Sequence, residues 1–163
     1  MMLTRTLSRR RFAAALGAAM VIAPSRIVFA AGPTIKVTRD PGCGCCEAWA
    51  DHLKANGFAV TVVDDPKINR LKAKLGVPSD LASCHTAEVE GYVIEGHVPA
   101  GAIKRLLAQR LKVKGLAVPG MPIGSPGMEV EGRPPETYSV MALGPSGKTM
   151  FARYKGADEL PGS

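Results

Sequence analysis

The chain has 163 residues, of which 21 are lysine or arginine and 14 are aspartate or glutamate, so its formal net charge is +7. Five arginines and no acidic residue lie in residues 1–30, which leaves 16 basic against 14 acidic residues in the rest of the chain. A nucleic-acid-binding surface needs clustered positive charge in the folded domain. The composition therefore argues against nucleic acid as a partner.

Residues 1–30 are typical of an export signal. A basic start precedes an apolar stretch from Phe12 to Pro24, and the small residues Val28 and Ala30 suit cleavage after Ala30. The apolar stretch is too short for the ~20 residues of a membrane-spanning helix, so we expect no span in the mature form. The segment SRRRF, residues 8–12, resembles the twin-arginine export signal. We predict a periplasmic protein that is exported by this route.

Residues 31–163 are expected to form a single domain in which strands and helices alternate. Period-two and apolar patterns predict strands at 34–39, 58–64, 90–96, 137–144 and 148–156, and helical periodicity predicts helices at 45–57, 65–76 and 98–110. The strand at 58–64 is apolar enough to be buried, and residues 77–89 show no regular period. Residues 118–135, rich in proline and glycine, form a long loop, which in compact domains is usually functional or disordered.

This order predicts an α/β fold with a central mixed sheet flanked by helices and a C-terminal hairpin. A Cys-x-x-Cys pair directly after the first strand narrows the layout to a thioredoxin-like one. The domain is large enough to bury a hydrophobic core without disulfide bonds. Its four cysteines therefore need another explanation.

Three cysteines, Cys43, Cys45 and Cys46, lie together at the predicted start of the first helix. A helix N-terminus favours ionised thiols, and the neighbouring glycines allow the sharp turn that lets sulfurs converge. The fourth, Cys84, precedes His85 in the segment LASCHTA. In a thioredoxin-like layout this loop faces the thiol turn, so we predict that four thiols and an imidazole meet.

Thiolates with imidazole or thioether ligands suit Cu(I) first and zinc second. Met121 and Met128 in the long loop are candidate thioether ligands, and His85 is a ligand or supports one. Alternatives remain open. A cysteine cluster in an exported chain is often a disulfide framework, and the methionines could simply pack in the loop. His52 is expected on a helix face, and His97 is expected to anchor a helix start.

Four segments of the sequence are distinctive: CGCCEAWADHLKANGF, LASCHTAEVEGYVIEGHVPAGAIKRLL, GLAVPGMPIGSPGME and YSVMALGPSGKTMFARY. They resemble the CopG-type copper-resistance proteins, which are small, exported, thioredoxin-like metal-binding proteins long catalogued as a domain of unknown function. The resemblance runs from about Ile35 to Tyr154. It implies periplasmic copper binding, with the four cysteines as thiol ligands, and possible electron exchange between thiol pairs and copper.

The leading hypothesis is therefore Cu(I) binding for copper resistance or delivery, with copper ions and periplasmic copper donor or acceptor proteins as partners. The main alternative is a thiol–disulfide oxidoreductase that uses Cys43 and Cys46, whose reactivity would follow exposure and ionisation. A third possibility is a structural module held by disulfides.

Overall fold

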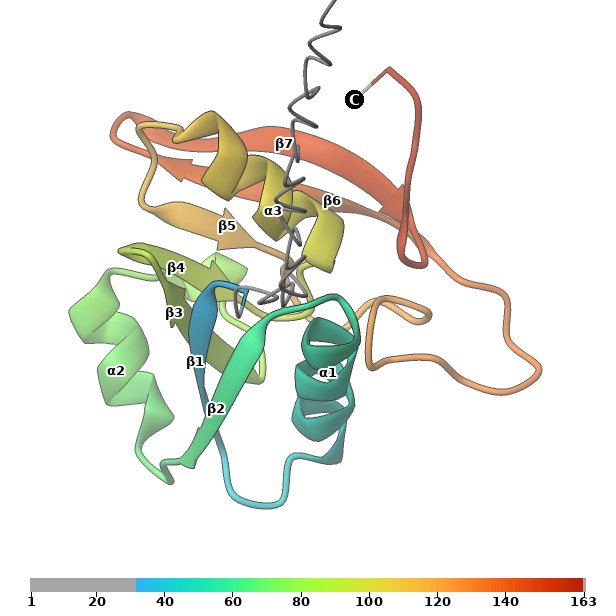
Figure 1. Cartoon of the computed structure of the whole chain (residues 1–163), viewed down its shortest axis with the longest axis horizontal. Coiled ribbons are helices and arrows are strands. Elements are labelled where there is room, and N and C mark those ends of the chain that lie inside the picture. Colours follow the sequence, from blue (N-terminus) through green and yellow to red (C-terminus); the bar gives the residue numbers. More distant parts are fainter. Residues whose placement is uncertain (1–31, 163) are drawn as a thin grey trace, which may run out of the picture.

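The computed structural model describes residues 32–162, which form one eight-stranded sheet and three α-helices (Figure 1). The strands are β1 (Thr34–Arg39), β2 (Ala59–Asp64), β3 (His85–Val89), β4 (Tyr92–Glu95), β5 (Gly115–Ala117), β6 (Thr137–Gly144), β7 (Gly147–Lys155) and β8 (Asp158–Glu159). The helices are α1 (Gly44–Ala55), α2 (Ile68–Leu75) and α3 (Ala100–Gln109), and a short 3₁₀ turn spans Ser79–Leu81.

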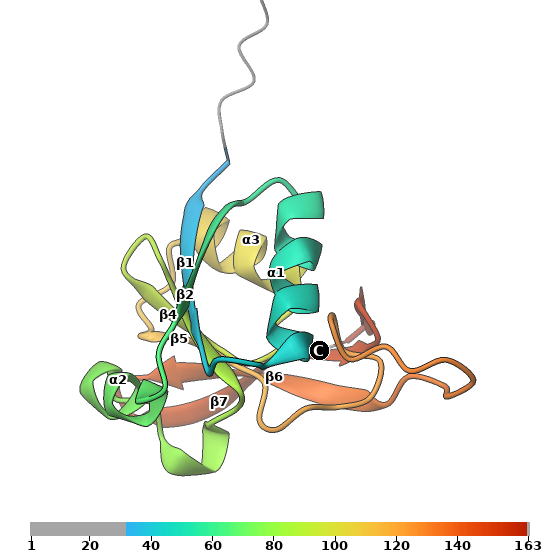
Figure 2. The ribbon, with the colours of Figure 1, turned by 90° about the horizontal axis from the view of Figure 1, so that it is seen from below.

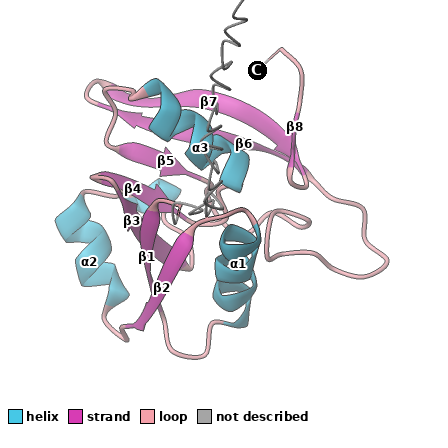
Figure 3. Ribbon diagram, viewed as in Figure 1, coloured by secondary structure: helices cyan, strands magenta, loops and turns pink. Residues whose placement is uncertain are grey.

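The sheet is mixed, with the strand order β2-β1-β3-β4-β5-β6-β7-β8 (Figure 3). Strand β1 runs parallel to β2 and antiparallel to β3, and β4 runs parallel to β5, whereas the other neighbours are antiparallel. The predicted α/β class, the mixed sheet flanked by helices and the C-terminal β6–β7 hairpin are confirmed. The thioredoxin-like assignment stays a prediction.

Helices α1 and α3 cover one face of the β1–β4 part of the sheet, and α2 covers the other (Figure 2). Because successive strand residues point to opposite faces, Ile35, Val37 and Ala87 face α1 and α3, whereas Thr38 and Thr86 face α2. The main hydrophobic core lies on the first face and includes Trp49, Leu53, Ile94, Ile103, Leu106, Leu116, Val140 and Tyr154.

Several sequence expectations about strands are wrong. The segment Ala59–Asp64 is an edge strand with half of its residues exposed, and not a buried one, because it pairs only with β1. Residues 77–89, expected to be irregular, contain the central strand β3, which is buried on almost every residue. Its polar side chains hid the strand pattern. The short strands β5 and β8 were also not anticipated.

The predicted export signal, residues 1–30, lies outside the described residues. Within residues 32–162, none of the helices combines the length and the apolar character that crossing a membrane requires.

Candidate metal centre

The first three cysteines surround the N-terminus of α1. Strand β1 ends at Arg39, and the turn that follows uses Gly42 in a left-handed conformation, φ 87°, which glycine adopts without steric cost. Cys43 occupies the N-cap position of α1. It forms a disulfide bond with Cys46 across 5.4 Å between Cα atoms, while Cys45 remains a free thiol. Of the three, Cys46 is buried and the other two are half-buried.

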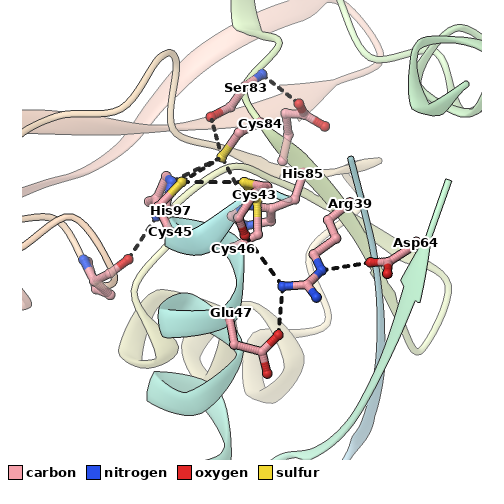
Figure 4. The surroundings of a disulfide bond; sticks show 12 residues. Arg39, Cys43, Cys45, Cys46, Glu47, Asp64, Ser83, Cys84, His85 and His97 are labelled. Carbon is pink, nitrogen blue, oxygen red and sulfur yellow. Dashed lines mark hydrogen bonds and ion pairs between the residues drawn. A yellow bond between two sulfur atoms is a disulfide. The ribbon is translucent and has the colours of Figure 1, made fainter. Parts of the chain in front are cut away.

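Cys84 reaches this turn because of strand pairing. It directly precedes β3, and β3 pairs with β1 so that His85 lies opposite Arg39. The Cys84 sulfur is 3.8 Å from the Cys45 sulfur, which lies 3.4 Å from the Cys43 sulfur (Figure 4). All four sulfurs fall within 4.8 Å of one another. The structure thus brings together the four cysteines that were predicted to converge.

Two histidines complete a second group around the same thiol. His85 Nδ1 lies 3.3 Å and His97 Nε2 lies 3.1 Å from the Cys84 sulfur (Figure 4). His97 Nδ1 is 2.8 Å from the carbonyl oxygen of Pro126. Since a carbonyl only accepts, Nδ1 carries the proton, and the free lone pair of a neutral ring at Nε2 faces the thiol.

The role expected of His97 is performed by His52 in the structure. His97 was expected to anchor a helix start, but it lies at the thiol cluster. His52 performs the anchoring, because its Nε2 accepts a hydrogen bond of 3.1 Å from the backbone N–H of Ala100 at the start of α3. The pairing of β3 with β4 could have predicted that His97 lies near Cys84. Thr86 pairs with Glu95, and continuing this register by two residues sets Cys84 opposite His97.

Burial makes the neutral forms of these groups the stable ones. It raises the pKa of the Cys84 thiol to about 12, with the nearby Cys45 thiol contributing in the same direction. Burial lowers the pKa values of His85 and His97. Neutral imidazoles are the form that binds metals, whereas the thiol must release its proton when a metal binds.

His85 is fully enclosed. Its ring lies 4.2 Å from the Trp49 ring and 4.9 Å from the His97 ring, measured between centroids. Its Nε2 is buried and, among residues 32–162, finds no hydrogen-bond partner. The unsatisfied nitrogen costs stability, which is consistent with a ring held for a function and not for packing alone.

Two solved structures named as copper resistance protein CopG, Form 1 and Form 2, are similar to this chain. They share 47% and 46% sequence identity with it, at TM-scores of 0.70 and 0.71. The matches cover 76% and 75% of this chain and 98% of each solved chain. The chain belongs to the CopG copper-resistance family. This confirms the resemblance found in the sequence.

A family model described as a protein of unknown function, DUF411, matches residues 81–128. A search of curated proteins gives no match. The matched segment of this CopG-family chain contains Cys84, both candidate histidines and both candidate methionines. The thiol turn lies before it.

The proline- and glycine-rich loop, residues 118–135, packs over the site of this CopG-family protein. It accepts a hydrogen bond of 2.6 Å at the Gly120 carbonyl from Ser83, next to Cys84. A Cβ atom added to Gly127 would lie 2.6 Å from the backbone nitrogen of Trp49 and 2.8 Å from the carbonyl oxygen of Cys45. The loop backbone therefore touches α1. The sequence left open whether this loop is functional or disordered; its contacts with Ser83 and α1 show that it packs against the thiol cluster, and a functional role stays a prediction.

The two methionines of this loop differ in exposure. Met121, which follows Gly120, is 52% exposed, whereas Met128, which follows Gly127, is partly buried. Each is therefore one residue from a glycine that touches the site. A ligand role for either sulfur stays a prediction.

Arg39 holds the thiol turn against the sheet (Figure 4). Its guanidinium lies 2.6 Å from Glu47 in the first turn of α1 and 2.8 Å from Asp64 at the end of β2. It also donates a hydrogen bond of 3.4 Å to the carbonyl oxygen of Cys43. The position of the first cysteine is thus tied to two strands and a helix.

Proposed function

We propose that this protein binds Cu(I) in the periplasm, for copper resistance or delivery, through Cys43, Cys45, Cys46 and Cys84. The observation that supports this most directly is the convergence of four sulfur atoms within 4.8 Å of one another. Membership of a copper-resistance family points to the same metal. Residues 31–163 would act as one metal-binding domain, after an export signal at residues 1–30.

The donor set favours Cu(I). Thiolate and imidazole ligands are soft enough for this ion, and zinc is the second candidate. Cys84 belongs both to the four-sulfur group and to the group formed with His85 and His97. We therefore add His97 to the predicted ligand set, in which both histidines bind the metal or orient the Cys84 thiolate.

The disulfide between Cys43 and Cys46 limits how many sulfurs can bind Cu(I). Only a thiolate binds the metal, so both sulfurs become ligands after the bond takes up two electrons. The oxidised protein offers two free thiols, Cys45 and Cys84. We expect it to hold Cu(I) more weakly than the fully reduced protein.

The test is an anaerobic titration of the reduced protein with Cu(I) in competition with a chromophoric Cu(I) chelator. Cys84→Ser and Cys45→Ser are each expected to weaken binding by more than about 100-fold, because each removes a sulfur that faces the shared site. Parent-like affinity in either variant would show that the shared thiol site is wrong. The same titration with Zn²⁺ compares the two metals.

The proposed methionine ligands have a matched control. Met121→Leu and Met128→Leu remove thioether sulfur at nearly constant volume. Met150 on β7 is 55% exposed, close to the 52% of Met121, and its sulfur accepts a hydrogen bond of 3.8 Å from the Ser139 hydroxyl. If either loop methionine is a ligand, its leucine variant weakens Cu(I) binding and Met150→Leu does not.

A thiol–disulfide oxidoreductase is the second candidate, and the disulfide itself favours it. The half-buried Cys43 sulfur is the more accessible end of the bond, and the free Cys45 thiol is 3.4 Å from it. Turnover of a disulfide substrate by metal-free protein, lost in Cys43→Ser, would support this activity. No turnover under those conditions would leave copper binding as the function.

Export by the twin-arginine route is tested in cells. Replacing Arg9 and Arg10 by lysine should retain the protein in the cytoplasm if that route is used. Metal analysis and a thiol count on protein taken directly from the periplasm would then identify the bound metal and the oxidation state. Exchange with copper donor or acceptor proteins is part of the same proposal.

A further inference from the structure

A buried ion pair lies on the sheet face opposite α1. Lys72 of α2 and Glu95 of β4 approach to 2.5 Å, and their side chains are 6% and 0% exposed. Burying two charges costs solvation energy that their attraction often fails to recover, so apolar replacements of such pairs are frequently neutral or stabilising. Stability alone is therefore a weak reason for this pair.

The carboxylate of Glu95 accepts hydrogen bonds from the residues on either side of Cys84 and His85. Its Oε1 accepts a hydrogen bond of 2.7 Å from the backbone N–H of Ser83, the residue before Cys84. Its Oε2 accepts one of 2.6 Å from Thr86, the residue after His85. The ammonium of Lys72 also donates to the Thr86 hydroxyl, at 2.8 Å.

The same region fixes the start of the segment that carries His97. Gly96 follows Glu95 and donates a hydrogen bond of 3.1 Å to the carbonyl oxygen of His85. A Cβ atom on Gly96 would lie 2.7 Å from the Ser83 Cβ, so the Gly96 backbone packs against the Ser83 side chain. The position of Ser83 therefore affects both Cys84 and His97.

We infer that Lys72 and Glu95 are a positioning pair, which holds the Cys84 thiol at the distance from Cys45 that metal binding needs. The pair acts through the Ser83 backbone, and its carboxylate touches none of the candidate metal donors in residues 32–162. Lys72 orients the carboxylate through the 2.5 Å contact, and the carboxylate anchors the loop through the Ser83 N–H. The inference rests on the proposed Cu(I) function.

The experiment compares two double variants, which differ in whether the side chain at position 95 can accept the hydrogen bond from the Ser83 N–H. Lys72→Met/Glu95→Leu removes both charges and the acceptor for the Ser83 N–H. Lys72→Met/Glu95→Gln removes both charges but retains an oxygen for that N–H and an amide for the Thr86 hydroxyl. The leucine variant is expected to bind Cu(I) at least about tenfold more weakly, the usual effect of removing a residue that orients a ligand. The glutamine variant should remain within about threefold of the parent.

A second measurement needs no metal. In a Cys43→Ser/Cys46→Ser background, equilibration with glutathione buffers gives the tendency of Cys45 and Cys84 to form a disulfide with each other, which depends on their relative position. The Lys72→Met/Glu95→Leu change should lower this equilibrium constant at least about tenfold. In a Cys45→Ser/Cys84→Ser background, the same change should leave the Cys43–Cys46 equilibrium unaltered.

Leu106→Ala is the control for general destabilisation, since it opens a cavity in the core on the other face. If it lowers Cu(I) affinity and the Cys45–Cys84 equilibrium as much as the leucine double variant does, the inference is overturned. Parent-like values for the leucine variant overturn it as well. If the parent itself fails to bind Cu(I), the proposed function fails, but the glutathione equilibrium still tests the pair.

If the leucine double variant does not fold, the single change Glu95→Gln takes its place. The amide has one oxygen, for which Lys72 and the Ser83 N–H then compete. The Cys45–Cys84 equilibrium constant should fall by at least about threefold, the equivalent of one weakened hydrogen bond. A parent value in this variant also overturns the inference.

Discussion

Replacing His97 by asparagine separates its two hydrogen-bonding roles. The asparagine amide can still donate to the Pro126 carbonyl, as Nδ1 does at 2.8 Å, and so keep the loop in place. It has no group that replaces Nε2, which lies 3.1 Å from the Cys84 sulfur. The variant therefore removes the nitrogen that faces the Cys84 thiol and keeps the hydrogen-bond donor that faces the Pro126 carbonyl.

The expected size of the effect distinguishes two roles for this imidazole. If Nε2 only accepts a hydrogen bond from the Cys84 thiol, its loss costs about 0.5–1.5 kcal/mol, or roughly two- to tenfold in an equilibrium constant. If it binds the metal or orients the thiolate, Cu(I) affinity falls by about 10- to 100-fold, or about 1.4–2.8 kcal/mol. We expect the larger loss, because His97 is fully buried beside the shared sulfur.

The assay is the Cu(I) competition titration on reduced protein, with His52→Gln as the matched control. His52 is partly buried, accepts a hydrogen bond from the backbone N–H of Ala100, and belongs to neither donor group. The glutamine oxygen can accept the same bond. A loss below about tenfold in His97→Asn, or an equal loss in His52→Gln, would refute the reasoning.

Three further predictions follow from single contacts. Gly127→Ala should weaken Cu(I) binding at least about tenfold in the same titration, because its Cβ would lie 2.8 Å from the Cys45 carbonyl oxygen. Gly132→Ala is the control: this glycine is also at positive φ, but a Cβ there has open space, so Cu(I) affinity should not change. Burial lowers the pKa of His52, so its neutral form stabilises the fold above about pH 6.5, and this contribution is lost as pH falls further. Urea denaturation of His52→Gln between pH 7 and 5 should show a shallower loss of stability than the parent, by up to about 1.4 kcal/mol per pH unit, and equal slopes would contradict this role. Trp49 is the single tryptophan and lies 4.2 Å from a candidate histidine ring, so Cu(I) titration should quench its fluorescence in step with binding; unchanged emission at saturation would place the metal elsewhere.

Local patterns in the sequence were sufficient for much of the fold and for the thiol turn. The β-branched alternation of Thr34–Arg39, the helical spacing after Cys46 and the glycine at position 76, which ends α2 in a left-handed conformation, all act over a few residues. The same holds for the cysteine turn itself, since its glycines and the helix N-terminus are adjacent in the chain. The family resemblance, which rested on four segments that include the cysteine turn, was confirmed.

The loop of Cys84 was expected opposite that turn, but only the tertiary structure decided how it gets there and that His97 joins it. Strand β3 is short, and its buried polar residue Thr86 is satisfied by Lys72 and Glu95, which are 14 and 9 residues away, so no local pattern marks it. Its pairing with β1 and β4 brings Cys84 to the thiol turn and His97 to Cys84. Strand register depends on pairing between distant segments and on which faces are buried. The sequence therefore determined which donors the chain carries, and long-range pairing determined which of them meet.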